Sequence, residues 1–194
     1  MEAYAGEWLQ LLLRWVHLIT AIAWIGASFY FVWLDNSLLA PKRRSDGDEG
    51  VGGELWAVHG GGFYHVQKFR VAPAELPAPL HWFKWEAYWT WLSGFALFVV
   101  MYYANARSYM IDPTVADISP AQAIGLSLAL LAGGWIGYDL LCKRAGLDRE
   151  RLVGLVMIVV LALVAWGLSH VFSGRAVYLQ IGAMIGTMMT ANVA

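Results

Sequence analysis

Long apolar stretches, each without a charged residue, dominate the pattern of hydrophobic and polar positions along the chain. A helix of about 20 such residues is long enough to cross a hydrocarbon core of ~30 Å. None of the stretches alternates with a period of two, which argues against a membrane barrel. The pattern therefore predicts an all-α integral membrane helix bundle with about five transmembrane helices, at residues 9–34, 84–106, 119–141, 151–173 and 176–194.

The composition agrees with a lipid membrane as the surrounding medium. Of the 194 residues, 59% are hydrophobic and only 14% are charged, which is too apolar for an ordinary soluble domain. The net charge is −1 and no basic patch is present, so we expect no nucleic-acid partner. The acidic N-terminus lacks a basic segment and a cleavage site, so we expect the first helix to be retained. The spacing of Gly133 and Gly137 predicts a close approach of two helices.

Basic residues indicate how the helices are oriented. Most of them lie between the first and second predicted helices and between the third and fourth. Cytoplasmic loops of membrane proteins carry an excess of Lys and Arg. The sequence therefore predicts that these two connections are cytoplasmic and that the N-terminus lies outside.

The predicted cytoplasmic loop, residues 35–83, is rich in charge, Gly and Pro. Its middle part, residues 54–71, alternates between polar and apolar positions around a triple glycine, which predicts a β-hairpin. Long ordered loops are frequently functional, but this loop could also serve only to cover the cytoplasmic face of the bundle. One face of its second strand would present Phe63, His65, Gln67 and Phe69, and the other Tyr64, Val66, Lys68 and Arg70.

Two histidines are candidates for a buried cofactor site. His17 lies within the first apolar stretch, where an unsatisfied polar group costs several kcal/mol. It therefore needs a partner, either a neighbouring helix or a metal such as haem iron. His170 lies near the outer end of the fourth helix at a similar depth, so the two imidazoles suit the two axial positions of a b-type haem. The alternative for His170 is an interfacial residue that faces water.

The single cysteine, Cys142, and the absence of a C-x-x-C-H motif exclude a covalently attached haem c on this chain. Residues 17–38, 60–69 and 81–95 together resemble the N-terminal membrane region of bacterial cytochrome-c-linked urate oxidases, and the resemblance covers the whole chain. It implies an oxidoreductase of the bacterial inner membrane, with a periplasmic N-terminus, that oxidises urate to 5-hydroxyisourate.

The resemblance also implies partners and a larger enzyme. Electrons would pass through haem to cytochrome c, which family members carry as an appended periplasmic domain with its own haem c. The chain is accordingly expected to be a single membrane domain, residues 1–194, from the N-terminal part of such an enzyme. The oligomeric state stays open.

Urate is a flat, acidic, amide-rich ring, so its binding calls for an aromatic face, a polar clamp and a base. The hairpin offers His65, Gln67 and Arg70 as catalytic candidates. Strand residues an odd number apart point to opposite faces, so His65 and Gln67 form one candidate set and Arg70 is a rival. Two alternatives stay open, a haem-bearing electron-transfer or haem-handling protein without a urate site, and a copper carrier that uses Met184, Met188 and Met189.

Overall fold

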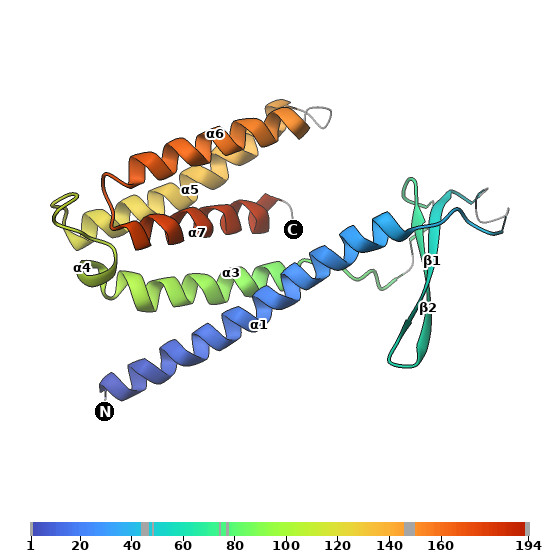
Figure 1. Cartoon of the computed structure of the whole chain (residues 1–194), viewed down its shortest axis with the longest axis horizontal. Coiled ribbons are helices and arrows are strands. Elements are labelled where there is room, and N and C mark those ends of the chain that lie inside the picture. The colour runs from blue at the N-terminus through green and yellow to red at the C-terminus, as the bar shows by residue number, and fades with distance from the viewer. Residues whose placement is uncertain are drawn as a thin grey trace. The chain divides into compact units, whose positions relative to one another are not determined.

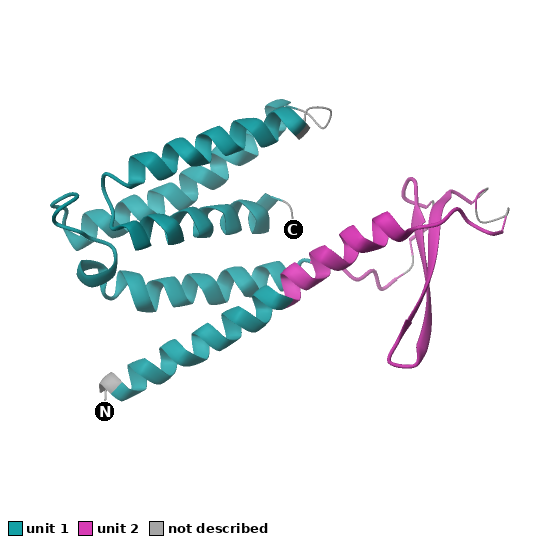
Figure 2. Ribbon diagram, viewed as in Figure 1, with its two compact units in different colours: residues 1–22, 84–194 teal, residues 23–83 magenta. Residues whose placement is uncertain are grey.

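The computed structural model describes residues 2–43, 47, 49–73, 75–76, 78–145 and 150–192. Its elements (Figure 1) are the helices α1 (Glu2–Ser37), α3 (Trp85–Phe98), α4 (Ala106–Tyr109), α5 (Pro120–Ala145), α6 (Glu150–Leu168) and α7 (Gly174–Asn192), the π-helix η1 (Val99–Tyr103), and the strands β1 (Val51–His59) and β2 (Gly62–Phe69). The structure divides into two compact units, residues 1–22 with 84–194 and residues 23–83 (Figure 2).

Each of the five predicted helical segments contains a helix, although α6 ends at Leu168 rather than at residue 173. The predicted number of membrane spans is not supported. Among the described residues, three helices are long and apolar enough to cross a membrane, and they are Tyr4–Ser37, Pro120–Ala145 and Arg151–Leu168. α3 has 14 residues, fewer than the ~20 that a span requires, before the π-helix η1 continues it. α7 carries polar side chains such as Gln180 and Thr187, which lower its mean hydropathy.

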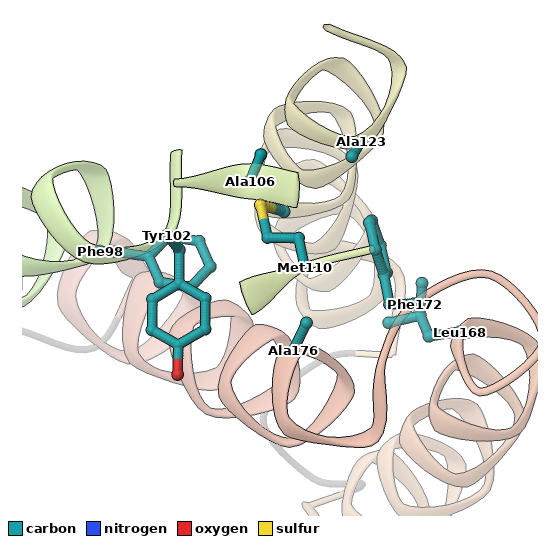
Figure 3. Packing of buried hydrophobic residues seen from close by; sticks show 8 residues of the cluster. All are labelled: Phe98, Tyr102, Ala106, Met110, Ala123, Leu168, Phe172 and Ala176. Carbon is teal, nitrogen blue, oxygen red and sulfur yellow. The ribbon is translucent and has the colours of Figure 1, made fainter. Parts of the chain in front are cut away.

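The first unit is a helix bundle in which α7 is central. α7 packs against α3, α5 and α6, and α1 runs beside α3 (Figure 1). A hydrophobic cluster closes the end of this bundle where η1 and α4 meet the start of α5 and α7 (Figure 3). Its members come from six elements and their connections, and they are Phe98, Tyr102, Ala106, Met110, Ala123, Leu168, Phe172 and Ala176. These side chains hold the turns at this end in place.

α5 packs tightly against α7 at Gly134. A Cβ atom added at Gly134 would lie 2.5 Å from Cγ of Met184, so a larger residue there would require the methionine side chains of α7 to move. The glycine spacing pointed instead to Gly133 and Gly137, where an added Cβ would meet no described atom within 4 Å. The spacing identified the right helix but the wrong residues, because Gly134 lies on the face of α5 that contacts α7, and spacing alone does not show which face that is.

Several polar side chains in this unit pair with one another across helices. Gln180 is 1% exposed; its Oε1 accepts the Ser127 hydroxyl at 2.6 Å and its amide donates to the Ser127 carbonyl at 3.1 Å. The Tyr103 hydroxyl lies 2.8 Å from Ser127 Oγ. The Trp91 indole donates to Thr187 Oγ1 at 2.9 Å. These bonds join α3, η1, α5 and α7, and they satisfy groups that would be costly to leave unpaired in apolar surroundings.

Candidate functional site

The predicted β-hairpin is confirmed in the second unit. β1 pairs with β2 in antiparallel register, with Glu54 opposite Gln67 and Trp56 opposite His65. The turn residues Gly60 and Gly61 have φ angles of 57° and 79°, the left-handed values that a two-residue type I′ turn requires. The register shifts near the open end of the hairpin, between Val51 and Gly53, which marks a β-bulge.

Glu54 is the buried centre of this unit. Its residue is only 5% exposed, and its carboxylate accepts the Lys42 backbone N–H at 3.0 Å and His65 Nε2–H at 2.9 Å. Its backbone exchanges two hydrogen bonds with Leu39, at 2.8 and 2.9 Å. The Lys42 N–H and the His65 side chain lower the pKa of the Glu54 carboxyl below its ordinary value. Glu54 is therefore ionised at neutral pH, and it ties segment 39–42 to both strands.

His65 is held on two sides by this arrangement. The Trp56 ring stacks on the His65 imidazole with the centroids 4.3 Å apart and the planes 11° from parallel. Because ionised Glu54 can only accept, it keeps a proton on Nε2 of His65, and the neutral imidazole then has Nδ1 as its acceptor. The side chain of His65 is 30% exposed. The cluster thus holds a partly exposed imidazole in one orientation and one tautomer, as a proton acceptor requires.

The other two predicted site residues lie in different places. Gln67 is directly opposite Glu54 and shares the face of His65. Arg70 follows the end of β2; its N–H donates to the Gly50 carbonyl at 3.0 Å, and its side chain packs where a Cβ of Gly52 would be. The structure therefore brings His65 and Gln67 together and sets Arg70 at the bulge.

Sequence reasoning did not single out Glu54 or Trp56. The alternation of β1 places both on the face of His65 once the turn at Gly60–Gly61 fixes the register. That signal was present in the sequence. The hydrogen bond from the Lys42 backbone N–H to Glu54 had no such signal, because it depends on the path of segment 39–42.

In the first unit, His17 finds its partner on α3. Its Nδ1 lies 3.1 Å from the Thr90 carbonyl oxygen and 3.3 Å from Ser93 Oγ. A neutral imidazole that donates from Nδ1 to a carbonyl leaves Nε2 unprotonated. The ring lies close against Gly94, where an added Cβ would be 2.8 Å from Cε1. His17 thus joins α1 to α3 and keeps one nitrogen of the kind that ligates metals.

His170 lies elsewhere in the same unit. It is exposed in the turn after α6, and its Nδ1 lies 2.8 Å from the carbonyl oxygen of Trp166 near the end of that helix. α6 packs against α5 and α7, whereas His17 bonds to α3; the view in Figure 1 shows α3 and α7 between α1 and α6. The structure does not bring the two predicted haem ligands together.

Metal binding by other side chains finds little support. Within the described ranges, no group of three or more His, Cys, Asp or Glu residues is placed to hold a metal ion. Met184 and Met188 are buried and pack against Gly134. Their role is to fill the interface between α5 and α7, as flexible methionines commonly do.

Comparison with known protein families decides the identity of the chain. The model of a family described as urate oxidase N-terminal matches residues 3–194. The chain belongs to the urate oxidase N-terminal family. Membership confirms the resemblance of the sequence and indicates a urate-related oxidoreductase. Comparisons with curated proteins and with solved structures give no match.

In this family member, Gly94→Ala should weaken the contact between α1 and α3. The new methyl group would overlap the rigid imidazole of His17, and overpacking of this kind costs typically 1–3 kcal/mol. Gly125→Ala in α5 is the matched control, because its Cβ would meet no described atom within 4 Å and Ala favours a helix. Thermal unfolding of the detergent-solubilised protein measures both. Equal midpoints for the two variants would contradict the close approach at Gly94.

The second unit should lose stability in acid. The pKa of Glu54 is lower in the folded unit than its ordinary value of 4.5, so its stabilisation is present in full above that value and is lost as the pH falls through the folded pKa. Hydrogen–deuterium exchange of peptides covering 38–59, corrected for the intrinsic pH dependence, should rise below pH 4.5 in the wild type. Glu54→Gln should exchange fast at all pH values. A wild-type profile that stays flat in acid would show that Glu54 does not hold the unit together.

Proposed function

We propose that this chain is the membrane module of a urate oxidase, which oxidises urate to 5-hydroxyisourate and passes the electrons through haem to cytochrome c. The match of the family model to residues 3–194 is the observation that carries the proposal. Three helices of a length and hydropathy that suit a bilayer support a location in the inner membrane, with the N-terminus periplasmic by the distribution of basic residues.

The reaction sets the demands on the site. Urate and one water molecule give 5-hydroxyisourate, two electrons and two protons. The site must therefore accept protons, orient a planar anion and lead electrons away. His65 supplies the proton acceptor at Nδ1, and ionised Glu54, 2.9 Å from Nε2, stabilises the imidazolium that forms. This pairing is the reason to prefer His65 over the other hairpin residues as the base.

Recognition of the ring can come from the same face of the hairpin. Phe63 lies two residues before His65 on β2 and is 78% exposed, so its ring is accessible for stacking on a flat substrate. Gln67, two residues after His65, carries an amide that matches the alternating N–H and C=O groups of urate. The face from Phe63 to Gln67 thus presents an aromatic surface, a base and an amide in one row.

A b-type haem is the electron acceptor that we propose for this chain, and His17 is its ligand. Histidines that ligate metals usually donate their other ring N–H to a carbonyl or a carboxylate. His17 has this arrangement, with Nδ1 at 3.1 Å from the Thr90 carbonyl and Nε2 left to face iron. A bound haem would supply one-electron redox chemistry. The haem c that receives the electrons belongs to an appended or partner cytochrome. We propose no second haem b ligand in this chain, because His170 bonds to the Trp166 carbonyl at the end of α6, whereas His17 bonds to α3.

Substitutions in the hairpin should separate the two candidate sets. His65→Ala should lower urate-dependent cytochrome c reduction by about 10²-fold or more, the usual contribution of a general base. Gln67→Ala should lower it by roughly tenfold, which corresponds to about 1.4 kcal/mol. Arg70→Ala, at the bulge, is the control and should stay near the wild-type rate. If Arg70→Ala were the only variant to lose cytochrome c reduction, Arg70 would replace His65 and Gln67 as the catalytic candidate. Unchanged rates in all three would leave the hairpin with only a covering role.

Haem binding has a spectroscopic test. Protein purified from haem-replete cells and reduced with dithionite should show a b-type α band, and His17→Ala should abolish it. Trp15→Ala, an exposed position on the same helix, is the control and should keep the band. His170→Ala should also keep the band, because His170 does not lie beside His17. Wild-type protein without an α band would remove haem from the proposal, and a band without urate turnover would favour a haem-handling protein.

A further inference from the structure

A cavity of about 660 Å³ lies between α5, α6 and α7, and neither His17 nor a residue of the hairpin lines it. Its lining includes Tyr138 and Lys143 of α5, Gly154 and Met157 of α6, and Met188 of α7. Along α6 the lining extends from Val153 to Leu161, which is about 12 Å at 1.5 Å per residue. The cavity is therefore an elongated apolar slot that follows the helices and has a lysine at one end.

The end of the cavity at Lys143 is positively charged. Lys143 bonds to Asp139 Oδ2 at 2.6 Å, so its charge is partly compensated. Arg144, next to it, and Arg151, two residues before Val153, are exposed, and neither forms an ion pair within the described parts of the chain. These cations belong to the connection between α5 and α6, two packed helices that are each long and apolar enough to cross a membrane. The apolar slot thus has exposed arginines within two residues of its lining, at helix ends where lipid headgroups are expected.

We propose that this cavity binds an anionic phospholipid, with one acyl chain between α6 and α7 and the phosphate at Arg144 and Arg151. Basic pockets between membrane helices on the cytoplasmic side are typical sites for anionic headgroups. The apolar lining from Met157 to Leu161 takes up the chain, and a zwitterionic lipid would gain less from the two arginines. The inference rests on the membrane location in the proposed function, and it goes beyond that function because no urate or haem residue takes part.

Gly154 offers a way to fill the slot. A Cβ at this position would meet no described atom within 4 Å, so a leucine can enter the cavity without pressing on the backbone of a neighbour. Gly167 is the matched control on the same helix, because it is equally free at Cβ among the described residues and does not line the cavity. A double variant, Arg144→Ala with Arg151→Ala, removes the charge and leaves the cavity unchanged.

The test uses the full chain in nanodiscs of phosphatidylcholine with one fifth phosphatidylglycerol, followed by native mass spectrometry of the lipids that stay bound. Wild type and Gly167→Leu should retain phosphatidylglycerol, whereas Gly154→Leu should retain at least tenfold less of it. The double arginine variant should lose the preference for phosphatidylglycerol over phosphatidylcholine. Equal retention of the two lipids by the wild type, or unchanged retention in Gly154→Leu, would overturn the site. Should Gly154→Leu fail to fold, the double arginine variant decides the outcome.

Urate turnover plays no part in this readout. Protein that sediments with carbonate-washed membranes but retains no phosphatidylglycerol overturns the lipid site alone. If carbonate extracts the protein from the membrane, the membrane location on which both proposals rest is wrong.

Discussion

The hydrogen bond from His17 to the Thr90 carbonyl is the interaction on which the position of α1 in the first unit depends. α1 is long and apolar, and most of its side chains are exposed. Apolar packing alone therefore does not determine which helix α1 contacts. A polar ring in an apolar helix must be satisfied within the protein, and the middle of α3 offers it the Thr90 carbonyl, the Ser93 hydroxyl and Gly94 side by side. The same requirement joins α5 to α7 through Ser127 and Gln180.

In the second unit a carboxylate has the corresponding role. The buried carboxylate of Glu54 on β1 accepts hydrogen bonds from the Lys42 backbone N–H and from the His65 imidazole on β2. Charge-assisted bonds of this kind are stronger than neutral ones. The consequence for chemistry is that His65 is oriented and has its acceptor nitrogen defined before any substrate arrives. A residue that stabilises the fold of this unit is thus also the one that prepares the proposed base.

The sequence was sufficient for features that depend on local pattern. Helix positions follow from apolar runs, and the hairpin follows from alternation around Gly60 and Gly61, since these signals lie within a few residues of one another. It was not sufficient for features that depend on which surfaces meet. Gly134 rather than Gly133 contacts α7, and Lys42 reaches Glu54 by its backbone, which carries no side-chain signal. The count of five spans is not supported, because among the described residues only three helices combine the length and the hydropathy that suit a bilayer.

The central claim is that this member of the urate oxidase N-terminal family oxidises urate without oxygen as the electron acceptor. Its most direct test is to incubate the wild-type protein in nanodiscs with urate and oxidised cytochrome c under strict anaerobic conditions, and to follow 5-hydroxyisourate and reduced cytochrome c together. The account predicts that product forms and that each product molecule accompanies the reduction of two cytochromes. Product that forms only when oxygen is admitted, with hydrogen peroxide in place of reduced cytochrome, would contradict it.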